Sequence, residues 1–258
     1  MIGKFFKKFE SLQSSPHLSV WRTIYFNFRT LPVKQAVKMP VRIFGKIKLS
    51  CLDGSVQLSS SKTRLKIGIN WAGYRYVSPG RISIMKGARL ILDNDVQISQ
   101  GVSLLVHKNA TLQLKTHCTV GDSSTIICYR DITIGRHSGI TWQCQVMDFN
   151  SHYICNEKGL ITSIISPIKI GDYCWIGNRT SVMPGTYLPD RTIVGSNSLL
   201  NKNYTATIPQ YSLIAGIPAK LIKTGLRRIY DTVAEHKLMN YFAENITPLS
   251  GDAFPEEM

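Results

Sequence analysis

The sequence predicts an all-β solenoid, a stack of short strands joined by corners. Three regularities predict it: an apolar residue at every sixth position, a glycine directly after several of these, and a small residue four places after most of them. The apolar series is clearest at Ile170, Ile176, Val182, Leu188, Val194 and Leu200. A period of six matches neither the 3.6 residues of a helical turn nor an uninterrupted strand. It fits one strand and one corner per hexad, so three strands would close a triangular coil of about 18 residues.

Each position of the hexad has its own structural reason. The apolar residue points into the prism, the glycine serves the corner, and the small residue fits where coils stack. The small residues are Cys174, Thr180, Thr186, Thr192 and Ser198, and the glycines are Gly171, Gly177 and Gly195. The same phase continues upstream at Leu114, Val120 and Ile126, weakens at Leu90, Val96 and Val102, and slips by two residues before Ile134, Ile140 and Val146.

A solenoid needs a cover at both open ends of its core. We expect a basic, aromatic N-terminal leader over residues 1–65, which would cap the start. The solenoid would occupy residues 66–218, with an active-site loop at 147–168. Residues 219–258 would form a C-terminal helix and tail, and the helix is placed near 219–243 because apolar residues recur there with helical spacing.

Composition excludes several classes of protein. Of the 258 residues, 43% are hydrophobic and 18% are charged, as in a globular chain rather than a disordered one. Six cysteines lie far apart without a CxxC pair, which argues against a disulfide scaffold or a zinc ribbon. With no secretory signal ahead of them, they fit a reducing, cytoplasmic compartment. No apolar run reaches the ~20 residues that span a bilayer.

Positive charge is concentrated at the start of the chain. Lys and Arg number 31 against 16 Asp and Glu, a net charge of +15. Residues 1–50 hold ten basic residues and one acidic residue, Glu10, with aromatic residues interleaved. This segment predicts peripheral contact with anionic lipid at the inner face of the plasma membrane, or a cap over the core, and the two are compatible. Nucleic acid is not expected as a partner, because no recognition motif accompanies the charge.

Three motifs between Ile170 and Lys223 carry a family resemblance: IGDYCWIGNRTSVMPG, IVGSNSLLNKN and YSLIAGIPAKLIK. They resemble the hexapeptide-repeat acyltransferases, and most of all the O-acetyltransferases of bacterial polysaccharide biosynthesis. The resemblance implies a left-handed parallel β-helix, acetyl-CoA as co-substrate, and a homotrimer with each site between two neighbours. It also implies transfer of an acetyl group to a hydroxyl of a cell-surface polysaccharide or its precursor, so the acceptor would be a glycan or sugar.

The repeat breaks between Val146 and Ile170, and such an excursion is where a solenoid places function. Asp148 and His152 lie at its start. A hydroxyl needs a base before it can attack a thioester, and imidazole suits that work near neutral pH. The resemblance assigns this base to His152. Asp148 could orient His152, bind an acceptor hydroxyl, or turn the chain.

The resemblance also maps the cofactor contacts. They fall on Asn178, Ser196, Asn201, Lys202, Lys220 and Lys223. The last two lysines would neutralise the nucleotide phosphates, or else they are ordinary cations of the terminal helix. Direct attack is expected, since no activated Cys or Ser accompanies His152. No metal is expected, because the sequence lacks the histidine pair that zinc-binding hexapeptide carbonic anhydrases use.

Two other functions stay open. One is an acetyltransferase for a soluble small molecule such as a free sugar, an antibiotic or an amino acid, which would give no reason for a basic, aromatic leader. The other is a non-catalytic β-solenoid that binds a surface through regular rows of threonine. Acetyl-CoA binding would separate a scaffold of that kind from either enzyme.

Overall fold

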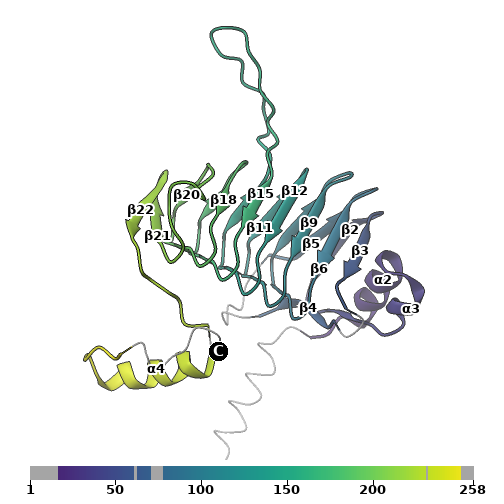
Figure 1. Ribbon diagram of the computed structural model, residues 1–258. Helices are drawn as coiled ribbons and strands as arrows, with labels where there is room; N and C mark the ends of the chain where they lie inside the picture. The colour runs from purple at the N-terminus through teal and green to yellow at the C-terminus, as the bar shows by residue number, and fades with distance from the viewer. Residues whose placement is uncertain (1–16, 61–62, 71–77, 231, 251–258) are drawn as a thin grey trace, which may run out of the picture.

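A computed structural model describes residues 17–60, 63–70, 78–230 and 232–250 of the chain. Its strands form three sheets that wind around one core as a triangular prism (Figure 1). Up to β20, neighbouring strands in a sheet are three apart in chain order, so each of these coils gives one strand to each sheet. The expected left-handed parallel β-helix with a C-terminal helix is confirmed.

The strands fall into three stacks, all parallel among the described residues except the last pair of the first sheet, β21 and β22. The first sheet contains β1 (Val41–Ile43), β4 (Leu65–Ile69), β7 (Gln97–Ser99), β10 (Thr119–Val120), β13 (Gly139–Ile140), β16 (Trp175–Ile176), β19 (Ile193–Val194), β21 (Leu213–Gly216) and β22 (Ala219–Lys223). The second contains β2 (Ile47–Leu52), β5 (Gly80–Ile84), β8 (Ser103–Val106), β11 (Thr125–Cys128), β14 (Gln145–Met147), β17 (Ser181–Val182) and β20 (Leu199–Leu200). The third contains β3 (Ser55–Leu58), β6 (Arg89–Leu92), β9 (Thr111–Leu114), β12 (Asp131–Ile134), β15 (Ile168–Ile170) and β18 (Tyr187–Leu188).

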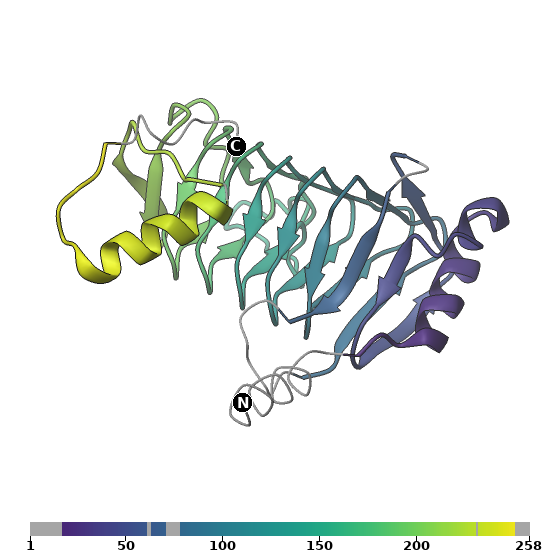
Figure 2. The same ribbon diagram turned by 90° about the horizontal axis from the view of Figure 1, so that it is seen from below.

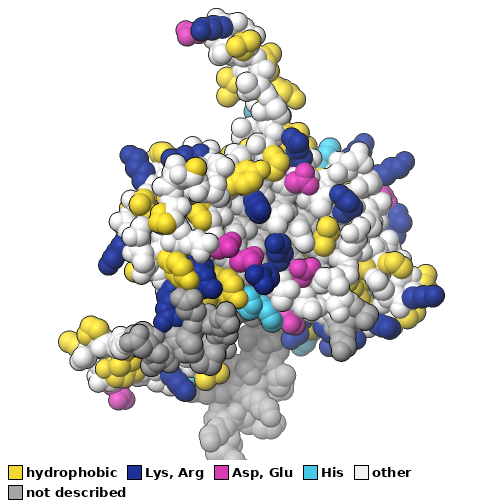
Figure 3. Space-filling model, in the orientation of Figure 1, with side chains coloured by type: hydrophobic (Ala, Val, Ile, Leu, Met, Phe, Trp, Pro, Cys, Tyr) yellow, Lys and Arg dark blue, Asp and Glu magenta, His cyan; other side chains and the backbone are white. Residues whose placement is uncertain are grey.

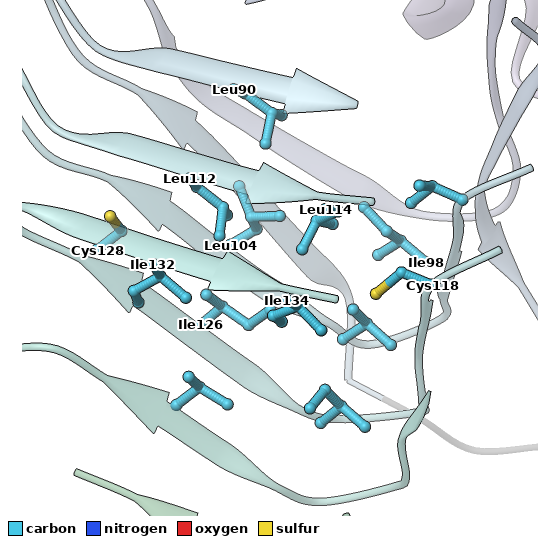
Figure 4. Packing of buried hydrophobic residues seen from close by; sticks show 14 of the residues in the cluster. Leu90, Ile98, Leu104, Leu112, Leu114, Cys118, Ile126, Cys128, Ile132 and Ile134 are labelled. Carbon is cyan, nitrogen blue, oxygen red and sulfur yellow. The ribbon is translucent and has the colours of Figure 1, made fainter. Parts of the chain in front are cut away.

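The hexad positions form the core as predicted. All six residues of the series from Ile170 to Leu200 are at most 3% exposed. Figure 4 shows the upstream part of the same core, where Leu112, Ile126 and Ile132 point to the interior of the prism. The small residues lie at the corners, where successive coils pack against each other. Thr186 is fully buried, and its hydroxyl donates to the carbonyl oxygen of Leu200 in the next coil at 3.0 Å. The glycine after the apolar residue is also explained, because a Cβ at position 171 would lie 2.6 Å from the backbone nitrogen of Asp190.

Coil length explains why the repeat fades upstream. Late coils have two-residue strands, whereas β6, β9, β11 and β12 have four residues each. Longer strands lengthen the coil and shift the phase of the hexads. Equivalent residues in adjacent coils are 18 apart at Asn178 and Ser196, 20 apart at Ser124 and Cys144, and 22 apart at Arg89 and Thr111.

The solenoid begins before residue 66, inside the segment expected to be leader. β1 and β3 pair in register with β4 and β6 of the next coil, and β2 pairs with β5 with one register shift. The leader that the structure describes is therefore shorter, and it consists of helices α2 (Val20–Thr30) and α3 (Val33–Ala36). No helix of the described residues is long and apolar enough to cross a membrane. The basic and aromatic residues among positions 1–16 lie outside the described part of the chain.

Helix α2 covers the first coil through polar side chains. The buried amide of Asn27 donates to the carbonyl oxygen of Val41 at 2.7 Å and accepts from the N–H of the same residue at 3.2 Å. The hydroxyl of Thr23 accepts from the N–H of Ile43 at 3.0 Å. These contacts satisfy backbone groups of β1 that have no further strand to pair with. Phe26, fully buried, completes the cover.

The C-terminal helix is shorter than expected and lies elsewhere. It is α4 (Thr232–Glu244), which lies below the prism in the view of Figure 1 and in front of its C-terminal coils in Figure 2, not across its end. The expected helix near residues 219–243 is wrong at its start, because Ala219–Lys223 pairs with the otherwise free edge of β21. Tyr204, 1% exposed, and Ile208, 7% exposed, cover the last coil instead.

Candidate active site

The excursion predicted from the sequence is a projecting loop, residues 148–167, between β14 and β15 (Figure 1). Arg136 and Asp172, in adjacent coils, are 36 residues apart, twice the 18 of the coil that follows. The loop is built as a narrow hairpin. The N–H of Asn150 donates to the carbonyl oxygen of Ile164 at 2.8 Å. Nearer the tip, the backbones of Cys155 and Ile161 form an isolated antiparallel β-bridge.

His152 lies on the outgoing arm of this hairpin and is exposed. Its imidazole makes no hydrogen bond within the described part of the chain. The side chain is therefore free to meet a substrate or a neighbouring molecule. Its place at the start of the excursion is as expected, and its role as a base stays a prediction.

Asp148 has a different environment from His152. Its carboxylate is fully buried and accepts hydrogen bonds from three backbone N–H groups. They come from Tyr129 at 2.6 Å, Arg130 at 2.8 Å and Asp131 at 2.9 Å. Burial raises the pKa of Asp148 above its ordinary value, although these donors oppose the shift. Of the three roles left open for Asp148, the contacts favour the structural one, since both oxygens hold the corner from which the loop departs.

A stack of three rings lies at the base of the loop. Tyr129 is sandwiched between His107, with ring centroids 4.2 Å apart, and Phe149, at 3.9 Å. His107 and Tyr129 follow equivalent residues of β8 and β11, so they occupy the same corner of successive coils. Sequence reasoning missed this stack. Its signal was two rings separated by one coil length, directly after buried strand residues.

Two of the expected cofactor residues share the corner between the first and second sheets. The hydroxyl of Ser196 donates to the side-chain oxygen of Asn178 at 2.5 Å. Asn178 is half-buried and Ser196 is exposed. Beside them, Trp175 lies against Gly139 of the preceding coil, where a Cβ would meet the indole at 3.2 Å. The structure thus brings Asn178 and Ser196 together as a hydrogen-bonded polar pair on this edge of the prism.

Two more expected residues lie on the corner from which the loop departs. Asn201 and Lys202 directly follow β20 in the second sheet, two coils beyond β14. Both are exposed, and the ammonium of Lys202 lies 5.3 Å from the ring centroid of Tyr204. They share their corner with the base of the loop and are separated from Asn178 and Ser196 by the width of the second sheet.

Lys220 and Lys223 lie on β22, so the alternative that they are cations of a terminal helix is wrong. Three residues apart on a regular strand, they would point to opposite faces. The pairing with β21 contains a register shift, however: Lys220 is opposite Ala215 and Lys223 is opposite Leu213. Those partners alternate with the buried Ile214 and face outward. The bulge therefore places both lysines on one outer face of the first sheet.

The segment before α4 covers part of that same outer face, which the sequence did not indicate. The guanidinium of Arg228 lies 3.7 Å from the ring centroid of Trp175 and 3.5 Å from the carboxylate of Glu235. Burial lowers the pKa of Arg228, although Glu235 opposes that effect. The hydroxyl of Tyr230 donates to the carbonyl oxygen of Tyr173. These contacts fasten the C-terminal segment to the coil that follows the loop.

Four of the six cysteines are buried, Cys51 is partly exposed, and Cys155 is exposed on the projecting loop. Cys118, Cys128, Cys144 and Cys174 are buried, and burial raises the pKa of each thiol. A raised pKa keeps the sulfur protonated and poorly nucleophilic. Within the described ranges, no group of three or more His, Cys, Asp or Glu side chains is arranged to hold a metal ion.

Comparison with known proteins agrees with the motifs. WbbJ of Escherichia coli (strain K12), named as an O-acetyl transferase of lipopolysaccharide biosynthesis, is 30% identical over 113 residues, 40% of this chain and 56% of WbbJ. WcaF of the same organism, named as an acetyltransferase of colanic acid biosynthesis, is 32% identical over 112 residues, 43% of this chain and 58% of WcaF. The chain resembles the hexapeptide-repeat acetyltransferases.

The extent of that resemblance is limited. The chain spans about half the length of the curated relatives it matches, and no family model matches it. Among solved structures, the polysialic acid specific acetyltransferase NeuO aligns with a TM-score of 0.47 and 16% identity, covering 80% of this chain and 98% of NeuO.

Proposed function

We propose that this protein transfers an acetyl group from acetyl-CoA to a hydroxyl of a cell-surface polysaccharide or its precursor. The observation that carries the proposal is the projecting loop, which presents an exposed histidine on a β-helix that resembles acetyltransferases. The names of the curated relatives support the O-acetyl chemistry and a sugar acceptor.

The chain offers groups suited to holding acetyl-CoA. Two lysines on one outer face, Lys220 and Lys223, would meet the nucleotide phosphates through charge-assisted contacts. Asn178 and Ser196 form a polar edge beside that sheet. Bound there, acetyl-CoA would supply an acetyl group activated as a thioester.

In this reaction the protein has to move one proton, from the acceptor hydroxyl to the departing thiolate. His152 would accept the proton of the acceptor hydroxyl while the oxygen attacks the thioester carbonyl. The C–S bond then breaks, and the proton can pass from the imidazole to the departing thiolate. No covalent acetyl-enzyme is needed in this route: four thiols are buried, and the exposed Cys155 takes no part in it.

A homotrimer with shared sites is part of the proposal. Within one chain, the loop corner and the Asn178 corner lie on opposite edges of the second sheet, so a neighbour could bring a second loop to this edge. Four apolar loop residues are 61–79% exposed, and Figure 3 shows hydrophobic side chains along the loop. They are Tyr153, Ile154, Leu160 and Ile161. Apolar surface of this kind favours a protein contact. Light scattering at micromolar concentration should give three times the chain mass, and a monomer would refute the shared site.

The decisive test is His152→Ala, with His236→Ala as the matched control, because both side chains are exposed. Loss of the base should lower turnover about 100-fold or more and leave acetyl-CoA affinity unchanged. The control should keep normal turnover. Acetyl transfer is followed with labelled acetyl-CoA and a panel of lipid-linked and free oligosaccharides. Near-normal turnover in a folded His152→Ala protein would place the base elsewhere. Failure of the wild type to bind acetyl-CoA would favour a binding solenoid.

A further inference from the structure

Helix α2 presents an aromatic face to solvent, and this face has no role in acetyl transfer. Trp21 is 75% exposed, Tyr25 45% and Phe28 47%. Their spacing places them along one side of the helix. Leu18, 45% exposed, continues the stripe towards the N-terminus. We call these four residues the aromatic stripe.

The fold imposes this orientation. The polar residues Thr23 and Asn27 lie on the inner face of α2, because they bond to the free edge of β1. Turning the helix to bury its aromatic residues would break those hydrogen bonds and leave buried backbone groups unsatisfied. The inner face of α2 therefore carries Thr23 and Asn27 beside the single buried ring of Phe26, and its other three aromatic rings face outward.

The charge around the stripe is predominantly positive. Residues 17–50 contain seven Lys and Arg and no Asp or Glu. Lys34, within α3, and Lys38, just after it, are exposed next to Val33 and Val37, which are 66% and 57% exposed. Figure 3 shows hydrophobic and basic side chains side by side at this end of the prism. Arg29 is partly engaged, since it forms an ion pair with Asp53.

We propose that the aromatic stripe and its basic surround form a docking surface for an anionic lipid bilayer. Exposed Trp, Tyr and Phe enter the headgroup region, and cations beside them meet lipid phosphates. A second copy of this chain is a poorer occupant, because two faces of the same positive charge repel each other. The surface lies at the capped end of the prism (Figure 2), away from the coils that carry the projecting loop. The proposal does not depend on acetyl transfer.

The test is flotation of the full chain with vesicles of mixed phosphatidylglycerol and phosphatidylcholine, compared with vesicles of phosphatidylcholine alone. The wild type should float with the mixed vesicles and do so less as salt rises. Trp21→Ser/Tyr25→Ser/Phe28→Ser removes the stripe without touching the inner face of α2. It should lower the partition coefficient about tenfold or more. Met239→Ser/Phe242→Ser removes two exposed apolar side chains from α4 and should bind as the wild type does.

Charge is tested separately with two variants of equal net charge. Lys34→Glu/Lys38→Glu should lower partitioning about tenfold or more, since each cation near an anionic surface contributes roughly a fivefold factor. Lys86→Glu/Lys108→Glu, at exposed turns elsewhere, should have a much smaller effect. Equal losses from both pairs would mean that net charge alone drives binding, and this would overturn the proposal.

Tryptophan fluorescence gives a second readout that does not depend on a variant which could misfold. Trp21 emission should shift to the blue on addition of mixed vesicles, and Trp21→Phe should abolish that shift while the protein still floats. Because residues 1–16 stay intact in every variant, lipid binding by that segment would leave the partition coefficient of the triple variant unchanged, which would refute the stripe. Self-association that the triple variant loses, without vesicle binding by the wild type, would assign the face to a second copy.

Discussion

Replacing Asp148 by alanine removes the acceptor of three backbone hydrogen bonds at the corner that supports the projecting loop. Hydrogen bonds to a charged group contribute about 1.5–3 kcal/mol each, and the low end applies because two of the donors belong to the exposed residues Arg130 and Asp131. Three such bonds amount to about 4–5 kcal/mol. Alanine also removes the cost of burying the carboxylate, which the raised pKa reflects. We therefore expect Asp148→Ala to lower the free energy of unfolding by about 3 kcal/mol.

Asp148→Asn separates this structural role from a catalytic one. The amide keeps one oxygen, which can still accept from Arg130 and Asp131, while its NH2 group faces the N–H of Tyr129. The expected loss is about 1–2 kcal/mol, a fall of roughly 2–8 °C in Tm for a chain of this size. Turnover per folded molecule should stay within about threefold of the wild type, because His152 keeps its freedom.

The assay pairs urea and thermal unfolding with acetyl transfer measured well below Tm, at one protein concentration. A variant with wild-type stability and turnover about 100-fold lower would refute the reasoning, since Asp148 would then act on His152 or on the acceptor. Equal losses of unfolding free energy in Asp148→Asn and Asp148→Ala would also contradict it, because the side-chain oxygen that asparagine retains would then contribute no stability.

Two further predictions concern charged side chains. Lys220→Ala/Lys223→Ala should weaken acetyl-CoA binding about 10- to 100-fold, less for dephospho-CoA and less at high salt, by calorimetric titration; unchanged affinity would remove the phosphate assignment. Asp172→Asn should lower stability by about 1 kcal/mol at neutral pH, a modest value because Arg136 is exposed. Burial alone would raise the pKa of Asp172, but hydrogen bonds from Arg136 hold it below the ordinary 3.8. The contribution is therefore present above that value and is lost as pH falls through the lowered pKa, so acid unfolding curves of the two proteins should converge. Curves that stay parallel would contradict the ion pair.

The prism could be predicted because each core residue is marked by its position within a short sequence repeat. One inward residue per hexad is a direct consequence of stacking two-residue strands, so the series ending at Leu200 indicates both the fold and its buried column. The first coils escaped because their longer strands shift the phase. The break of the repeat located His152 for the same local reason, since any insertion interrupts the period.

Contacts between distant residues could not be predicted. The role of Asp148 depends on backbone groups 17–19 residues earlier, which only the closed coil brings near. The common face of Lys220 and Lys223 depends on a register shift against β21, whereas their spacing of three indicates one face of a helix. The outward rings of α2 depend on the edge of β1. In each case the position of a side chain depends on a neighbouring strand or coil that is distant in sequence.

The two ends of the projecting loop meet where it leaves the prism. The N–H of Ser166 donates to the carbonyl oxygen of Asp148 at 2.9 Å, and β14 and β15 remain paired with their own sheets on either side. The coil is thus closed beneath the hairpin, so the hairpin can vary in length or sequence without moving any strand of the stack. An ancestor could have gained or exchanged it in a single insertion. Related chains can therefore diversify at this one corner while their scaffold stays constant.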